Sequence, residues 1–483
     1  MVSSDLLHQL IHSLSKTEKK YFKETSSGQN YVKLFDAINE QKEYDEEKLR
    51  KKFKGETFIN NFSAAKSYLQ EALLRSLRNF NAGKLMDDVS YERLQNIKLL
   101  YEKGFVTVAE KQLAKLKQFC YTYELYTRLL EVFSFEMQLN NGLNRSNEKL
   151  YAERKRILKV LGNINELNQV YGEMIAIATR TGYHSKAQTD MVEQLMQNPL
   201  LNENAICGEP DEKYALWNVF FVYHYISKNF SEAYKAKMKQ FELYRDGDVI
   251  IKTRPKTYLL MLGNLVSLAY NIPSLHDFEY SYEQMLKAHE AVKGFESLKF
   301  EQRSAFGLLL FRLKRDYRHL DAHVQYISEN LEKHAGNISL VRETDTYFNV
   351  ALAFFRKKDY NKTIDWLQKI IDHPRPDERL QIQRIARHML LLVHYELKNF
   401  ELLDYMITNT QRYLAKRNLS DEFDKVLLNG FKALIKAAGK PALKKALQKL
   451  KAEMQGIKKN EAAPKNEAEF EYLAWIEDKL NTV

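Results

Sequence analysis

A three-residue signature recurs four times in this chain and constrains its fold more than any other feature. The signature joins a lysine or arginine to Asp or Asn and then to Phe or Tyr, and it stands at Lys228–Phe230, Arg315–Tyr317, Lys358–Tyr360 and Lys398–Phe400. An apolar run with helical spacing precedes each copy, and a second helical segment follows each copy. The pattern therefore predicts successive helical hairpins, each closed by a tight turn.

The clearest copy spans Tyr347–Pro374 and shows why one hairpin needs neighbours. Its large apolar residues fall three or four positions apart, which places them on one face of each helix. They are Tyr347, Val350, Ala351 and Phe354 in the first helix, then Ile364, Leu367, Ile370 and Ile371 in the second. A single hairpin cannot shelter such a face from water, so we expect the copies to stack on one another.

This unit resembles a tetratricopeptide repeat. The residues that match the family pattern, in order, are Tyr347, Ala351, Phe354, Tyr360 and Pro374. The residues that depart from it are Thr363, Leu367 and Ile370. Two of these departures are larger than the family residue, which implies re-angled helix packing.

The resemblance is clearest over about 215–415. The turn at Lys358 lies 43 residues after Arg315 and 40 residues before Lys398, whereas the standard repeat has roughly 34 residues. We therefore expect longer helices or connections, in an all-α, right-handed α-solenoid of irregular curvature. Gly and Pro are scarce, at 17 and 8 residues, and alternating β-branched segments are missing, so almost no sheet is expected.

Breaks in the pattern divide the chain into four predicted regions. Residues 1–84 form a small N-terminal helical domain, and 85–210 form irregular helical repeats that include separate helices at about 146–161 and 164–180. Residues 211–430 carry the TPR-like repeats. Residues 431–483 supply a lysine-rich helix, a linker and a C-terminal capping helix.

The N-terminal region has two interpretations. Solenoids need caps that cover the apolar end of the first repeat, and a bundle of short helices suits that role. Alternatively, the short helices followed by a longer basic one form a helix-turn-helix fold, with Lys66, Arg75 and Arg78 facing DNA.

The C-terminal region also has two interpretations. Phe431–Lys465 carries ten lysines against Glu453 and Glu461, and this charge is either a solvated face or a handle for an acidic partner, RNA, DNA or anionic lipid. The last helix, Glu467–Leu480, is acidic, and it either caps the solenoid or folds back on the basic helix. Its apolar residues are Phe470, Leu473, Trp475 and Ile476.

Motifs for catalysis and cofactor binding are missing. The chain has no phosphate-binding glycine loop, no Gly-x-Ser-x-Gly and no His-Glu-x-x-His. His319 and His323 have the spacing of metal ligands, with Asp316 as a third, and His8 and His12 share that spacing. We interpret both pairs as solvated helix faces, and we expect no enzyme, catalytic residue, metal or cofactor.

Charge and cysteine content indicate a soluble cytoplasmic protein. The net charge of +11 arises from 74 basic residues mixed with 63 acidic ones, as on solvated helix surfaces. Cys120 and Cys207 lack metal or redox spacing, so free thiols in a reducing compartment are expected. The N-terminus does not have the pattern of a signal peptide, and no apolar run approaches the roughly 18 residues of a membrane span.

The resemblance also implies a binding surface. In tetratricopeptide arrays the first helices of successive repeats line a concave groove, which would bind an amphipathic helix or an extended peptide. By the frame above, the groove residues of this chain are Asn218, Val222, Tyr225, Ala305, Arg312, Phe348, Phe355, Arg356, His388 and Tyr395. The alternative for each is packing between helices.

These features predict a non-enzymatic scaffold that binds a protein or peptide in its groove. The alternative function is a nucleic-acid-associated regulator that uses its basic N-terminal or C-terminal helices. Salt-sensitive binding to arbitrary DNA or RNA would favour that alternative.

Overall fold

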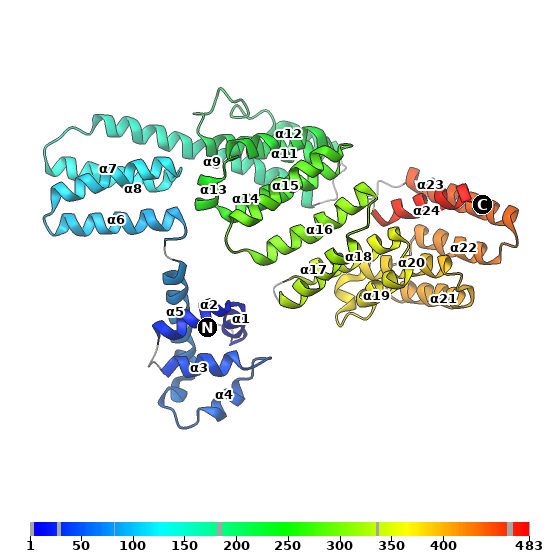
Figure 1. Cartoon of the computed structure of the whole chain (residues 1–483). Coiled ribbons are helices and arrows are strands. Elements are labelled where there is room, and N and C mark those ends of the chain that lie inside the picture. Colours follow the sequence, from blue (N-terminus) through cyan, green and yellow to red (C-terminus); the bar gives the residue numbers. More distant parts are fainter. Residues whose placement is uncertain are drawn as a thin grey trace. The chain divides into compact units, whose positions relative to one another are not determined.

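The computed structural model describes residues 4–26, 30–81, 83–180, 186–334, 338–460 and 467–482. Within these ranges the regular elements are all helices, which confirms the all-α prediction (Figure 1). None of the described helices is long and apolar enough to cross a membrane.

The described part of the N-terminal half consists of successive helices. They are α1 (Ser4–Ser13), α2 (Lys16–Thr25), α3 (Asn30–Asn39), α4 (Glu46–Lys52), η1 (Thr57–Asn61), α5 (Phe62–Asn81), α6 (Met86–Glu102), α7 (Val106–Thr122), α8 (Tyr126–Gly142), α9 (Glu148–Arg180), α10 (Lys186–Leu195), α11 (Pro210–Ile226) and α12 (Phe230–Leu243).

The C-terminal half continues as paired helices with short connections. They are α13 (Asp248–Thr253), α14 (Pro255–Tyr270), α15 (Leu275–Ala291), α16 (Glu296–Lys314), α17 (Leu320–Lys333), α18 (Leu340–Lys357), α19 (Tyr360–Ile371), η2 (Pro376–Arg379), α20 (Leu380–Glu396), α21 (Phe400–Lys416), α22 (Glu422–Lys436), α23 (Lys440–Asn460) and α24 (Glu467–Thr482).

The chain divides into two compact units. Unit 1 comprises residues 1–173, 196–222 and 236–260, and unit 2 comprises the remaining residues, 174–195, 223–235 and 261–483. Helices α1 to α8 belong to unit 1 and α15 to α24 to unit 2, while α9, α11, α12 and α14 contribute residues to both. The predicted boundaries at 84, 210 and 430 rest on other criteria and stay predictions.

The recurring signature shares one backbone feature at all four positions. Its first residue lies in the left-handed region, with φ of 57° at Lys228, 51° at Arg315, 64° at Lys358 and 60° at Lys398. At Lys398 the amide bonds to the Tyr395 carbonyl at 3.0 Å, and the next amide bonds to the His394 carbonyl at 3.0 Å. This pair of bonds is the Schellman end of a helix, which satisfies carbonyls that would otherwise lack partners.

The left-handed turn yields a test of the hairpin architecture. A lysine Cβ is strained at φ 60°, whereas glycine is not, so Lys398→Gly should stabilise unit 2 by about 0.5–1 kcal/mol. The matched control is Lys416→Gly, inside the last turn of α21, which should destabilise the unit by about the same amount. Chemical denaturation measures both, and a destabilising Lys398→Gly would contradict the turn assignment.

Unit 2 contains the predicted repeat-like packing of hairpins. Helix α18 packs on α19, α19 on α20, α20 on α21 and α22 on α23, so neighbours in sequence are neighbours in space (Figure 1). The first helices are buried on several sides because each meets its own partner and an adjoining hairpin. Val350 to Phe355 of α18 are six consecutive buried residues, as expected of a helix enclosed by others.

One predicted break in unit 1 is wrong. Residues 148–180 form a single 33-residue helix, α9, rather than two helices divided near Gly162. Gly162 lacks a proline beside it, and a lone glycine lowers helix stability by only about 1 kcal/mol. The next residue, Asn163, is buried and donates to the Glu212 Oε1 at 2.8 Å, so this position is a packing site rather than a turn.

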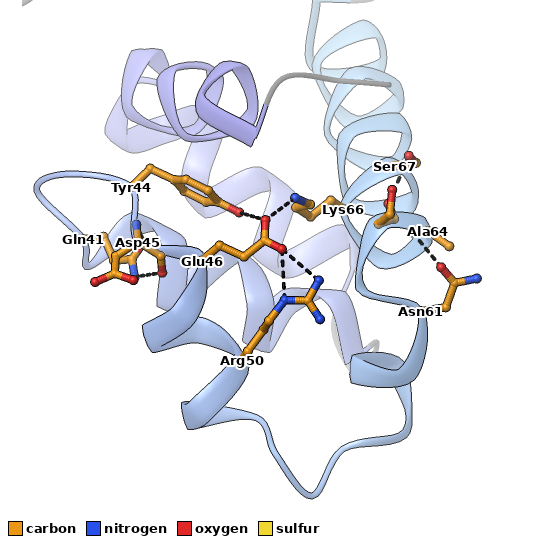
Figure 2. A network of polar contacts seen from close by, with 10 residues as sticks. Gln41, Tyr44, Asp45, Glu46, Arg50, Asn61, Ala64, Lys66 and Ser67 are labelled. Carbon is orange, nitrogen blue, oxygen red and sulfur yellow. Dashed lines mark hydrogen bonds and ion pairs between the residues drawn. The ribbon is translucent and has the colours of Figure 1, made fainter.

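The N-terminal helices share one apolar core, and a polar network holds α4 to α5. Figure 2 shows the Glu46 carboxylate accepting hydrogen bonds from Lys66 at 2.6 Å, Arg50 at 2.8 Å and Tyr44 at 3.2 Å. Lys66 and Arg50 hold the pKa of Glu46 below its usual value. Lys66 is therefore paired within the protein instead of facing outward for DNA, whereas Arg75 and Arg78 are exposed.

The prediction that both histidine pairs lie on solvated faces is wrong in part. His319 is exposed, but His323 is mostly buried, with its ring 5.6 Å from Phe311 and 6.0 Å from Tyr326. His8 is buried, and its Nε2 lies 2.9 Å from the Gln41 carbonyl. Both rings fill space between helices, which spacing along one helix cannot reveal.

Candidate functional site

The candidate site is the face of unit 2 formed by the first helices α18, α20 and α22, which we call the first-helix face. Helix α20 lies in its middle. It is buried over most of its circumference because it contacts α18, α19 and α21 as well as the residues of α24 described below. The two ends of α20 carry different polar groups. The N-terminal end bonds to α22, and the C-terminal end bonds to α24.

At the C-terminal end of α20, the carboxylate of Glu396 is nearly enclosed. Its side chain is 10% exposed, and both oxygens bond to α24. The Trp475 indole Nε1 donates to Oε1, and the Lys479 ammonium donates to Oε2 at 2.7 Å. Burial and then the neighbouring Glu396 carboxylate raise the pKa of the Tyr360 hydroxyl to about 12.

Aromatic rings surround this carboxylate. The Trp475 ring meets the Tyr395 ring edge-on at a centroid distance of 5.5 Å and lies 6.0 Å from the Phe431 ring. Further along, the buried Tyr472 ring lies 6.0 Å from the Phe423 ring of α22. Aromatic pairs at such distances each contribute about 0.5–1.5 kcal/mol beyond their buried area.

The N-terminal end of α20 is tied to α22 by ion pairs. Arg384 donates to the Asp424 Oδ1 at 2.8 Å and to the Asp421 Oδ2 at 2.5 Å, and the His388 Nε2 lies 3.0 Å from Asp424. Asp421 and Asp424 also form the capping box that begins α22. Burial acts to raise the pKa of Asp424, but His388, the Asp421 backbone and Arg384 together hold it below its usual value.

The ten predicted groove residues are divided between the two units, and their assignment to one groove stays a prediction. Asn218 and Val222 belong to unit 1, and the other eight belong to unit 2. Val222, Phe355, His388 and Tyr395 are buried, which agrees with packing between helices. Ala305, Arg312, Phe348 and Arg356 are half-buried, and Tyr225 is 50% exposed.

The structure brings together only part of that set at the first-helix face. Tyr395 contacts Trp475, and Arg356 of α18 is influenced electrostatically by Asp478 of α24. Sequence reasoning missed Glu396, although it directly follows Tyr395. It also missed that Tyr472, Trp475, Ile476 and Lys479 share one face of α24, which their spacing of three, four and seven residues indicates.

Asn218 is engaged inside unit 1. Its Oδ1 accepts from the Lys237 Nζ at 3.0 Å, and Lys237 also donates to the Gln240 Oε1 at 2.8 Å. The ammonium lies 4.1 Å from the Phe221 ring centroid. Lys237 is 3% exposed and neither hydrogen-bond partner is a carboxylate, so burial lowers its pKa to about 7.

A second buried polar cluster in unit 1 joins α11 to the turn before α8. The Tyr244 hydroxyl lies 2.7 Å from the Asp211 Oδ1 and 3.0 Å from the Glu124 Oε2, and Arg254 pairs with Asp211 at 2.5 Å. Burial and the nearby Asp211 raise the pKa of Glu124 to about 7. One arginine offsets two carboxylates here, which accounts for the raised value.

The comparisons with known proteins place no family beside this site. A scan against protein-family models finds none that matches the chain, and a search of the curated proteins finds no match. The described residues contain no group of three His, Cys, Asp or Glu side chains arranged to hold a metal ion. Function has to be inferred from the geometry of the chain itself.

The buried lysine gives a pH test of the geometry around Asn218. Because the folded pKa lies below the unfolded value of 10.5, unfolding takes up a proton between pH 7 and 10.5. The wild-type protein should therefore gain stability as pH rises through that window, by up to about 1.4 kcal/mol per pH unit from this group. Lys237→Met should lose that contribution.

The measurement is chemical denaturation at a series of pH values, comparing each variant with the wild type. Lys235→Met is the matched control, since Lys235 lies on the same helix but is exposed and pairs with Glu232 at 2.6 Å. It should keep the wild-type slope. Equal slopes for Lys237→Met and the wild type would show that burial does not lower the pKa of Lys237.

Proposed function

We propose that this chain is a non-enzymatic scaffold that binds a protein or peptide along the first helices of TPR-like hairpins. The observation that carries the proposal is the first-helix face, on which an amphipathic helix of the chain itself, α24, lies against α20 and α22. A surface that holds one amphipathic helix through buried rings and a carboxylate has the chemistry to hold a helix of another protein.

Several features support a tetratricopeptide-like, right-handed α-solenoid as the architecture behind this function. The first residue of the recurring turn is left-handed at all four positions, and Ala351 sits fully buried at the position where the family has a small residue. Thr363 stands at another small position and is also fully buried, with its hydroxyl bonded to the Asp359 carbonyl at 2.8 Å. The hydroxyl is thereby satisfied within the helix.

The proposed location is the cytoplasm. Cys120 and Cys207 are free thiols, the first buried and the second half-buried. Burial raises the pKa of Cys120 to about 12, so this thiol is unreactive and suits a reducing compartment.

The alternative function is binding of nucleic acid through exposed cations. Arg75 and Arg78 project from α5 into solvent, and Lys444, Lys445 and Lys449 do so from α23. On α23, Leu447, Leu450 and Met454 are buried, so the lysines occupy the outward side. Such a stripe attracts phosphate, although it is equally the ordinary polar side of an amphipathic helix.

Affinity capture from a lysate of the native host separates the two functions. A protein scaffold should retain its partner after nuclease treatment and at high salt, whereas phosphate binding weakens steeply with salt. Capture that vanishes on nuclease treatment, and is lost in Arg75→Glu plus Arg78→Glu, would establish the alternative instead.

A matched pair of substitutions tests where the partner binds. Phe348→Glu alters a half-buried predicted groove residue on the first helix α18, and Tyr405→Glu alters an exposed ring on the second helix α21. We expect the first to reduce capture about tenfold or more and the second to leave it unchanged, because only first helices line the proposed site. Loss in both, or only in Tyr405→Glu, would contradict the proposed groove.

A further inference from the structure

The last helix reaches beyond the position that a capping helix requires. A helix that only seals the end of a hairpin stack needs to cover the final hairpin, α22 and α23. Helix α24 does contact these two, through Phe431 and through an ion pair of Glu477 with Lys451 at 3.0 Å. It also contacts α20 one hairpin earlier, through Trp475 and Lys479.

Helix α24 meets α20 through polar groups in addition to its buried Tyr472, Trp475 and Ile476. The carboxylate of Glu396 accepts hydrogen bonds from Trp475 and Lys479, both on α24, and it also interacts with the Tyr360 hydroxyl of α19. If α24 left, a carboxylate now 10% exposed would lose both of these partners, and the Tyr395 and Phe431 rings would lose their contacts with Trp475. A buried acid with aromatic walls is a specific acceptor for an indole N–H and an ammonium group.

Contacts that do not involve α24 hold α20 to α22. Residues 461–466 read Glu-Ala-Ala-Pro-Lys-Asn, which is the composition of a linker. Helix α24 contributes Tyr472, Trp475 and Ile476 to the core, whereas α20 and α22 retain contacts with each other through Arg384 and Asp424. A tethered occupant of this kind competes with external ligands at a high effective concentration.

We propose that α24 is the resident occupant of the first-helix face and that the natural partner is an amphipathic helix of another protein with the same recognition pattern. That pattern is an indole-bearing residue followed four positions later by a lysine, with an aromatic residue three positions earlier. The partner displaces α24, and Glu396 reads its indole and ammonium groups. This inference rests on the proposed function and names the chemistry of the partner.

A binding experiment on the full-length chain tests the proposal. The probe is a fluorescent peptide of residues 467–483, which carries the pattern itself. The opened variant is Trp475→Ala plus Lys479→Ala, which weakens the resident helix without touching α20. It should bind the probe at least about tenfold more tightly than the wild type, because the tethered competitor is removed. The control Asn481→Ala alters an exposed residue of α24 and should bind like the wild type.

Charge reversal shows whether Glu396 reads the lysine. The opened variant with Glu396→Lys should lose the wild-type probe and bind a probe carrying Lys479→Glu, which also proves that the face remains folded. If the opened variant melts like the wild type but binds neither probe more tightly, the proposal is overturned. If it dimerises by exchanging α24 and excludes the probe, a second copy is the occupant and the proposal of a partner helix is also overturned.

The outcomes distinguish this inference from the proposed function. Capture of a host protein together with no gain in probe binding would overturn this inference alone. Tighter probe binding by the opened variant, with no captured protein for either chain, would overturn the proposed scaffold function while leaving the helix-binding chemistry of the face in place.

Discussion

The apolar faces of the hairpins in unit 2 have no shelter from water except one another, and this constraint organises the rest of that unit. Helix α20 shows its effect most clearly, since residues from Ile382 to Tyr395 are buried on almost every side of the helix. Such a helix is unstable as an isolated segment and acquires its stability from α18, α19, α21 and α24. The proposed binding surface on the first helices is therefore built from the same residues that hold the hairpins together.

The first-helix face combines two kinds of interaction that serve different purposes. At one end, ion pairs join α20 to α22 through Arg384, Asp421 and Asp424. The two aspartates also cap α22, so this end fixes the position of α22 on α20. At the other end, Glu396 bonds to α24. Removal of Lys479 would leave the carboxylate of Glu396 as a buried, uncompensated charge. In the proposed mode of binding, Glu396 therefore selects a partner helix that supplies the same hydrogen-bond donors.

Much of the fold was predictable because its signals are local. The spacing of apolar residues predicts each hairpin, and the signature that ends at Tyr360 or Phe400 predicts a turn that the structure shows to be left-handed at its first residue. The same local reasoning failed at Gly162, where a glycine without a proline stays helical, and at His323, where packing between α16 and α17 removes a polar ring from water. The candidate site was less accessible, because Tyr395 of the predicted groove contacts α24 while Glu396, the next residue, was not predicted.

The sequence by itself determined the helices, their amphipathic faces and the turns between them, since each depends on residues fewer than about five positions apart. Only the tertiary structure decided that Glu396 meets Lys479, a partner 83 residues away. Periodicity records which side of a helix avoids water, but it does not record which other helix covers that side. The pairing of a carboxylate with an ammonium so distant in the chain is set by how the hairpins of unit 2 pack.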